Sequence, residues 1–241
     1  MKIALVDERM PKDAKRRLEL DGFYTLDVPK SKRLPEPVSA HPDMVLFHHE
    51  KTIISSAEYC DEFPYFFEDL TKLIPGITLE LTDDVFAESY PHDAIFNALV
   101  IKNKIFLKSD SVSPAVISYA KRRGLEICNT KQGYPACTSL ALSPIHVITA
   151  DSGMAKLFTK DGIKTTIIEN GDILLPPYKY GFIGGASGLF RDKVYFIGDY
   201  RTHRNADLIE SALREEKLTP ISLSPSPLLD LGRIVFIDDG V

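Results

Sequence analysis

The chain has 241 residues, of which 44% are hydrophobic and 26% are charged, and its mean hydropathy is -0.07. These values are typical of a globular protein and exclude a largely disordered chain. Lys and Arg number 29 against 34 Asp and Glu, for a net charge of -5, which excludes the broad basic surface that nucleic acids or anionic membranes need. We therefore expect a small-molecule substrate or ligand, no nucleic acid and no membrane partner. The oligomeric state stays open.

Three cysteines, Cys60, Cys128 and Cys137, cannot all pair with one another, and no C-x-x-C occurs. Neither a disulfide scaffold nor a thiolate zinc site is indicated, and free thiols favour a reducing compartment. The N-terminus breaks into charge after four apolar residues, short of a signal peptide, and no stretch approaches the roughly 20 apolar residues of a membrane span. We expect a cytoplasmic protein that needs no cofactor and no metal.

One pattern of strands and helices recurs along the chain. In the N-terminal unit, residues 3–6 are the predicted second strand, residues 12–20 the helix, and residues 24–28 the third strand. Four complete units follow, each with a first strand, a short turn, a second strand, a helix and a third strand. Their predicted elements are 44–47, 52–54, 66–73 and 77–79; 95–101, 105–107, 116–120 and 125–128; 140–142, 147–149, 154–158 and 163–168; and 180–183, 194–197, 207–214 and 220–223. Glycines end the first four helices, at Gly22, Gly76, Gly124 and Gly162.

The N-terminal unit lacks a first strand, and the C-terminus offers one spare strand at residues 231–237. If that strand pairs with residues 3–6, the chain closes into a ring, which removes exposed sheet edges and creates a central channel. We therefore predict an α/β fold, a five-bladed α/β propeller of ββαβ repeats with pseudo-fivefold symmetry. The prediction is one domain over residues 1–241, with repeats at approximately 227–241 plus 1–37, 38–88, 89–131, 132–175 and 176–226.

The alternative is an open, doubly wound sheet that binds a nucleotide. The first junction between a strand and a helix, residues 7–11, has no G-x-G-x-x-G, and the strands come in hairpin pairs rather than singly. Both observations favour the ring. A crevice at a switch point of one open sheet would indicate the alternative.

The five units and the tracts QGYPAC (132–137) and YGFIGGASG (180–188) resemble a known superfamily. It is the pentein, or guanidine-group-modifying enzyme, fold, and the tracts look like those of an uncharacterised bacterial family of that fold. The resemblance implies that a cysteine attacks the central carbon of a guanidinium group, that a histidine shuttles protons, and that carboxylates hold the substrate's nitrogens. Another branch, the ribosome anti-association factors, is not catalytic, so the fold alone does not decide the chemistry.

Alignment of the five first strands by their entry places Asp43, Asp93, Cys137, Ile183 and Asp230 at equivalent positions. A closed ring then brings three carboxylates and one thiol to one end of the channel. Carboxylates bind the planar donors of a guanidinium, and a thiolate is a strong nucleophile. Cys137 is the candidate nucleophile, and the three aspartates are candidate substrate-binding residues. The alternative for these residues is a buried structural thiol and strand-end Asx turns.

Two histidines, His92 and His41, are candidates for proton transfer. His92 adjoins Asp93, so in a regular strand the two side chains point to opposite faces, whereas His41 and Asp43 are two apart and share a face. In the deiminase branch a His-x-Asp pair opens the unit just before the nucleophile's, and here that spacing occurs one unit earlier. Both histidines therefore stay candidates.

Two other sets of residues have structural interpretations. Asp7, Asp110, Asp151 and Asp199 recur at the end of a second strand, where an acidic residue caps exposed N–H groups of the next helix. The glycine-rich tract 184–188 lacks the Lys-Ser/Thr ending of a phosphate loop, and it predicts a close approach of backbones near the channel.

The position of the nucleophile departs from the superfamily pattern. In the known hydrolases it lies in the last unit, whereas Cys137 lies in the fourth predicted repeat. Either the constellation is rotated by one unit, or the channel binds a ligand without catalysis. The preferred function is a cysteine-dependent hydrolase or transferase for an arginine-like guanidino compound, through a covalent thiouronium intermediate. The alternative is a non-catalytic module that binds a small molecule or a protein.

Overall fold

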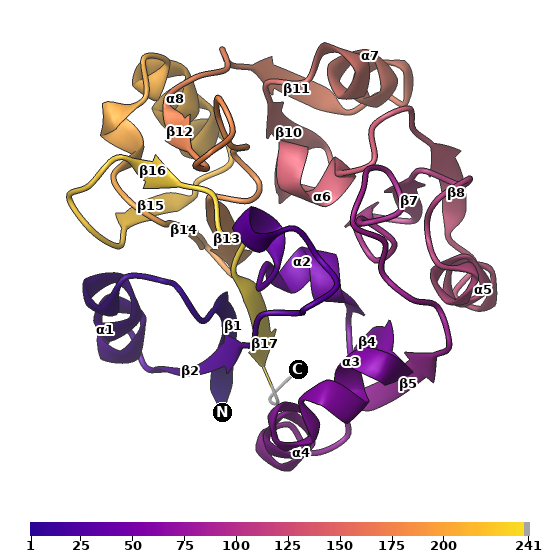
Figure 1. Cartoon of the computed structure of the whole chain (residues 1–241). Helices are drawn as coiled ribbons and strands as arrows, with labels where there is room; N and C mark the ends of the chain where they lie inside the picture. The colour runs from indigo at the N-terminus through magenta and orange to yellow at the C-terminus, as the bar shows by residue number, and fades with distance from the viewer. Residues whose placement is uncertain (239–241) are drawn as a thin grey trace.

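The computed structural model describes residues 1–238 and has a mixed α/β fold (Figure 1). Residues 239–241, which the prediction assigns to the first repeat, lie outside the described residues. Within residues 1–238 the strands form five three-stranded sheets and one two-stranded sheet, none of them closed into a barrel. In sheet order the strands are β17 (Val235–Asp238), β1 (Lys2–Asp7) and β2 (Phe23–Val28); β3 (Leu46–His49), β4 (Thr52–Ser56) and β5 (Thr78–Thr82); β6 (Leu99–Ile101), β7 (Lys104–Leu107) and β8 (Glu126–Asn129); β9 (Ser139–Ser143), β10 (His146–Thr149) and β11 (Lys164–Ile167); β13 (Ser187–Phe190), β14 (Lys193–Phe196) and β15 (Thr219–Ser222); and β12 (Ile173–Leu174) with β16 (Leu228–Leu229).

The three-stranded sheets share one pairing pattern. In each, the middle strand runs antiparallel to the first strand and parallel to the third. A helix joins each middle strand to its parallel partner, as a crossover connection requires. The helices are α1 (Lys12–Leu20), α2 (Pro42–Val45), α3 (Ala57–Glu62), α4 (Pro64–Leu73), α5 (Pro114–Arg122), α6 (Pro135–Thr138), α7 (Ser152–Lys160) and α8 (Ala206–Glu215), with 3-10 turns η1 (Glu36–Val38) and η2 (Tyr200–Thr202). Figure 1 shows α1, α4, α5, α7 and α8 at the periphery, and α2 and α6 toward the middle.

The two ends of the chain share one sheet. Strand β17 pairs antiparallel with β1, with Ile237 opposite Ile3 and Val235 opposite Leu5. All four side chains are buried in the same apolar cluster, so hydrophobic burial stabilises the register. This ladder confirms the predicted pairing of the C-terminal strand with residues 3–6.

The predicted first strands are where the structure differs most from the sequence expectation. The entries to two of them are single helical turns, α2 and α6, and β3 and β9 begin directly afterwards. Of the predicted strand 95–101 only β6 is strand, and residues 180–183 precede β13 instead of forming a strand. Pro42 and Pro135 give the physical reason for the two turns, because proline has no N–H for a ladder and its fixed φ suits the first turn of a helix.

Most helix boundaries follow local sequence signals. Gly22, Gly76, Gly124 and Gly162 all have positive φ, between 64° and 86°, after the first four crossover helices. The Asp151 side chain accepts a hydrogen bond from the amide of Met154 at 2.8 Å, which confirms its predicted capping role. Asp199 accepts one from the amide of Arg201 at 3.0 Å, which caps the 3-10 turn η2 and not the helix α8. Within residues 1–238, no helix combines the length and the apolar character that crossing a bilayer demands.

Candidate functional site

The thiol of Cys137 and the carboxylate of Asp43 are in direct contact. Cys137 lies in α6 and Asp43 in α2, the two short helical turns toward the middle of the molecule (Figure 1). The Cys137 thiol donates to Oδ2 of Asp43 at 2.8 Å. The exposed fractions of the two residues are only 4% and 5%. The two side chains therefore lie together, as the sequence alignment of the units predicts.

A third side chain, Asn97, fixes this pair. Its Nδ2 atom lies 3.1 Å from the Cys137 sulfur and 3.3 Å from the backbone oxygen of Asp43. Its Oδ1 atom accepts a hydrogen bond from the amide of Ala136 at 2.9 Å. Asn97 therefore anchors both α6 and α2, and it holds the sulfur beside the carboxylate.

Burial keeps protons on this pair. Burial raises the pKa of the Cys137 thiol well above its ordinary value, and the nearby charges of Asp43 and Asp230 raise it further. Burial also raises the pKa of Asp43 to about 6, against the opposing effect of its hydrogen bond with Cys137. With these neighbours, the thiolate is a minor form at neutral pH.

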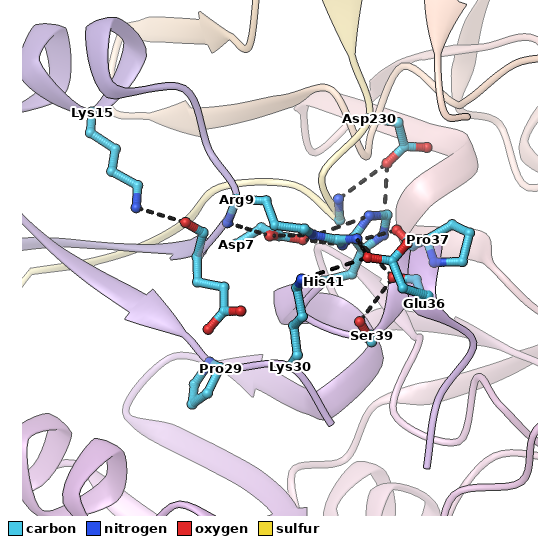
Figure 2. A network of polar contacts seen from close by, with 12 residues as sticks. Asp7, Arg9, Lys15, Pro29, Lys30, Glu36, Pro37, Ser39, His41 and Asp230 are labelled. Atoms are coloured by element: carbon cyan, nitrogen blue, oxygen red, sulfur yellow. Dashed lines mark hydrogen bonds and ion pairs between the residues drawn. The ribbon is translucent and has the colours of Figure 1, made fainter. Parts of the chain in front are cut away.

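His41 lies between two carboxylates, Asp7 and Asp230. Its Nε2 atom is 3.9 Å from Oδ2 of Asp7, and its Nδ1 atom is 3.9 Å from Oδ1 of Asp230 (Figure 2). Burial lowers the pKa of His41 to about 3, with a further decrease from the charge of Arg9. The imidazole is therefore neutral at physiological pH, and its Nε2 atom has no hydrogen-bond partner within the part of the chain that the structure describes.

Arg9 pairs with Asp7 and so offsets the effect of the Asp7 charge on the pKa of His41. The Arg9 guanidinium forms a two-pronged contact with Asp7, with distances of 2.9 Å and 2.6 Å to its two oxygens. It also donates to the backbone oxygens of Glu36 and Pro37, as Figure 2 shows. Asp7, which the sequence assigns a structural role, is thus fully buried and paired with Arg9 next to the candidate site.

Asp230 is buried at the cavity and accepts hydrogen bonds from the backbone. Burial raises its pKa to about 7, although two backbone amides donate to it. These amides belong to Phe182, at 2.8 Å, and Gly232, at 3.1 Å. An added positive charge in the site would favour its ionised form.

The carboxylate of Asp93 contacts a tyrosine hydroxyl. The hydroxyl of Tyr134 donates to Oδ2 of Asp93 at 2.6 Å, and burial raises the pKa of this carboxyl above its ordinary value. Oδ1 of Asp93 is buried and has no partner among residues 1–238. The adjacent His92 is exposed and does not line the cavity that Asp93 faces.

These side chains meet at one cavity of about 490 Å³. Cys137, His41, Asp93 and Asp230 are among the residues that line it. Asp43 is not: it lies behind the thiol and lines a smaller cavity of about 110 Å³ with His48 and Arg233. The remaining residues that line the larger cavity are Pro35, Val38, Met44, Glu88, Tyr90, Tyr134, Leu175, Tyr178, Lys179, Tyr180 and Phe182.

The glycine-rich tract before β13 packs directly against the site. The amide of Gly185 donates to the backbone oxygen of Cys137 at 2.9 Å. A side chain at Gly184 would collide with backbone oxygens of α6 and β9, and one at Gly185 would collide with the Asp230 carboxylate. The structure confirms the predicted close approach of backbones at this tract.

The other two cysteines lie elsewhere. Cys60 and Cys128 do not line the cavity, and burial raises the pKa of the Cys128 thiol to about 11. No group of three or more metal-ligating side chains converges among residues 1–238.

Sequence reasoning missed Asn97 and the role of Tyr134. Asn97 is the one amide in the apolar run 94–101 and is 1% exposed, and a lone polar residue in such a run signals a buried hydrogen bond. Tyr134 lies inside the noted tract 132–137, but its contact with Asp93 joins segments 41 positions apart. The local sequence pattern does not predict such a contact.

Comparisons with known proteins agree with this fold. The model of a family of unknown function (DUF6873) matches residues 5–235. No curated protein matches the chain in sequence. Among solved structures, a cysteine-to-serine variant of DDAH from Pseudomonas aeruginosa, complexed with citrulline, has a TM-score of 0.58 at 10% identity and covers 93% of this chain and 91% of its own.

Two further solved structures give similar values. The amidinotransferase SxtG from Microseira wollei, of the saxitoxin biosynthetic pathway, has a TM-score of 0.54 at 12% identity and covers 92% of this chain and 88% of its own. The agmatine deiminase of C. jejuni has a TM-score of 0.55 at 7% identity and covers 92% of this chain and 76% of its own. At such identities the likeness shows the fold alone. The chain belongs to the DUF6873 family, and it has the pentein fold of these solved structures.

Proposed function

We propose that the protein is a cysteine-dependent hydrolase or transferase that acts on a guanidino compound. The observation that carries the proposal is the shared cavity wall of Cys137, Asp93 and Asp230, with Asp43 in contact with the sulfur. A guanidinium offers planar N–H donors to carboxylates and a central carbon to a nucleophile. The solved structures of similar fold include a hydrolase, an amidinotransferase and a deiminase.

The guanidinium would place a positive charge beside the carboxyls and the thiol of the cavity. Asp93 and Asp230 face the cavity and hold the cation, which lowers the pKa of both carboxyls and of the Cys137 thiol. The sequence prediction makes Asp43 a further substrate-binding residue. Its place behind the sulfur favours a different role, in which Asp43 accepts the thiol proton.

The reaction then proceeds in two halves. The Cys137 sulfur forms a bond to the guanidinium carbon, the bond from that carbon to one nitrogen breaks, and the leaving amine takes up the proton that the thiol released. The enzyme now carries a thiouronium group. Water, or an acceptor amine in a transferase, attacks the same carbon, the C–S bond breaks, and the thiol recovers its proton. His41 is neutral and lines the cavity, so it can accept the proton of the attacking water.

We also propose that the five three-stranded sheets are the blades of a single α/β propeller domain over residues 1–241. The common pairing pattern and the β17 to β1 ladder support this architecture. The repeat boundaries remain those of the sequence prediction. The three unpaired cysteines support a reducing compartment such as the cytoplasm.

A non-catalytic binding module is the second candidate, because one observation favours it. Burial and two neighbouring carboxylates all raise the pKa of the Cys137 thiol, which favours its protonated form. A protein that only binds a cation would tolerate such a thiol. In that case the cavity would hold the ligand without bond formation to sulfur.

A panel of guanidino compounds separates the two candidates. Wild-type protein should release ammonia or an amine from at least one compound, and Cys137→Ser should abolish that release while a thermal melt shows an intact fold. Cys128→Ser is the matched control, because it removes a buried thiol outside the cavity and should leave turnover unchanged. Turnover that survives in Cys137→Ser would refute the nucleophile. Binding without turnover in both proteins would establish the binding module.

A further inference from the structure

The cavity divides into a deep end and a mouth of different chemistry. At the deep end lie Cys137, Asp230 and His41, each at most 4% exposed. At the mouth, Tyr90 and Tyr178 are each 50% exposed. A guanidinium held beside the sulfur would therefore direct the rest of its molecule outward, past these rings.

The charged side chains that line the cavity are mostly acidic. Glu88, Asp93 and Asp230 contribute three carboxyls, and Lys179 is the one cation among the residues that line it. Arg9, whose charge acts on His41, is occupied by Asp7 and two backbone oxygens. A carboxylate on the substrate would meet like charges and would lack the forked arginine contact that such groups favour.

The rings of the wall are fixed before any ligand binds. Tyr90 and Tyr134 pack with their centroids 5.2 Å apart. The Tyr90 hydroxyl accepts from the amide of Gly133 at 3.1 Å and contacts the backbone oxygen of Lys131 at 3.3 Å. A side chain at Gly133 would meet the Tyr90 ring, so glycine is what lets the ring lie there.

A second pair of rings comes from another loop of the same wall. Tyr180 and Phe182 pack with their centroids 6.3 Å apart, and both line the cavity. Aromatic faces attract cations and bury alkyl chains, whereas the negative potential of a ring face does not attract a carboxylate. Glu88 is exposed at the mouth and forms no ion pair with another residue in the range 1–238, so it is available to a ligand.

We propose that the substrate is a guanidinoalkyl amine without a carboxylate, whose distal ammonium lies among the tyrosine rings and Glu88 at the mouth. This inference rests on the proposed function, because it takes the guanidinium to be bound beside Cys137. It goes further by assigning the class of the distal group. It also assigns Glu88 as the residue that selects it.

The test is calorimetric titration of Cys137→Ser protein with four probes of matched length. They are 4-guanidinobutylamine, n-butylguanidine, 4-guanidinobutyrate and arginine, and the variant prevents turnover during the titration. We expect the amine to bind at least about tenfold tighter than the butyrate and arginine, because a cation–π contact and one charge pair together contribute on this order. The affinity for butylguanidine should lie between that for the amine and those for the butyrate and arginine.

Two further substitutions assign the selectivity to the mouth. Glu88→Gln should reduce the affinity for the amine several-fold and leave that for butylguanidine unchanged. Lys179→Met is the matched control at the same mouth and should not weaken the amine. Equal affinity for the amine and the butyrate would overturn the inference while leaving the proposed function intact. The same holds if the butyrate binds more tightly than the amine and Lys179→Met removes that preference. Failure of all four probes, butylguanidine included, would instead refute the proposed function.

Discussion

Cys137 and Asp43 are 94 positions apart in the chain, yet the thiol of the first donates to the carboxylate of the second at 2.8 Å. Each lies on a short helical turn that begins with proline and precedes a first strand. The charge of Arg233 lowers the pKa of Asp43, but burial, which raises that pKa, is the larger effect. Burial therefore keeps the proton on the thiol, and we propose that the charge of a bound guanidinium moves it to the carboxylate.

Asp43→Asn should make the Cys137 thiol more reactive. The substitution removes a neighbouring negative charge that raises the pKa of Cys137, so a larger share of the sulfur is thiolate at pH 8. We expect iodoacetamide to alkylate Cys137 faster in this variant than in wild type, as followed by peptide mass spectrometry. Cys128 provides the internal control, and its rate should not change. An unchanged or slower rate at Cys137 would show that Asp43 does not hold the thiol protonated.

Asn97→Ala should have the opposite effect on the same thiol. The Asn97 amide is a contact that lowers the pKa of Cys137, and its oxygen satisfies the buried amide of Ala136. Loss of both contacts should slow alkylation, and it should cost about 1 to 3 kcal/mol of unfolding free energy through the unsatisfied amide. Denaturant melts and the same alkylation assay measure the two effects. Faster alkylation with an intact fold would contradict this assignment of Asn97.

The pH dependence of stability should report the buried Asp43. Its pKa is about 6 in the folded chain against an ordinary value of 3.8, so the folded state binds the proton more tightly than the unfolded state. The stabilisation is complete below pH 3.8 and is lost as the pH rises through 6. At pH 8 the buried charge should cost about 3 kcal/mol.

Asp43→Asn isolates this contribution, because an amide carries no charge at any pH. The unfolding free energy of the variant relative to wild type should therefore increase between pH 4.5 and pH 8. Asp172→Asn is the contrasting control, since Arg204 lowers the pKa of this carboxyl below 3.8 and its stabilisation is therefore already complete at pH 4.5, so the difference between this variant and wild type should be nearly the same at pH 4.5 and pH 8. A difference between Asp43→Asn and wild type that is the same at both pH values would exclude a raised pKa at Asp43.

Gly232→Ala should disturb the site through His41. Gly232 has a φ of +69°, and a methyl group there would collide with the His41 side chain. Left-handed strain of about 1 to 2 kcal/mol then adds to overpacking of about 1 to 3 kcal/mol. Gly76→Ala is the matched control, with a φ of +86° and nothing within 4 Å. Equal losses of stability in the two variants, measured by denaturant melts, would mean that Gly232 does not support His41.

The periodic parts of the fold were predictable from sequence, and the reason is local. The helix at residues 12–20 coincides with α1, and the second strands follow apolar runs such as 105–107 in β7. The pairing of β17 with β1 was also predictable, because a repeat pattern with one missing strand at one end and one spare strand at the other has a simple solution. Repetition thus supplied information that a single unit does not contain.

The entries to the first strands were not predictable, because there the chain is not periodic. Alternation along a strand predicts that His41 and Asp43 share a face, but Asp43 lies on a helical turn and points behind the cavity that His41 lines. The raised pKa of Cys137 also depends on burial by segments distant in sequence. Residue type thus indicated side chains that meet at the cavity, whereas the separation of Asp43 from the cavity lined by Asp93 and Asp230 depends on contacts between segments distant in sequence.

The most direct test of the account is the mass of the Cys137 peptide after acid quenching of protein mixed with a guanidino compound that it turns over. The account predicts a covalent adduct on Cys137 that equals the compound minus its leaving amine, that appears during turnover, and that is absent from the peptides of Cys60 and Cys128. Turnover with an unmodified Cys137 at every quench time, together with full activity of Cys137→Ser, would contradict it.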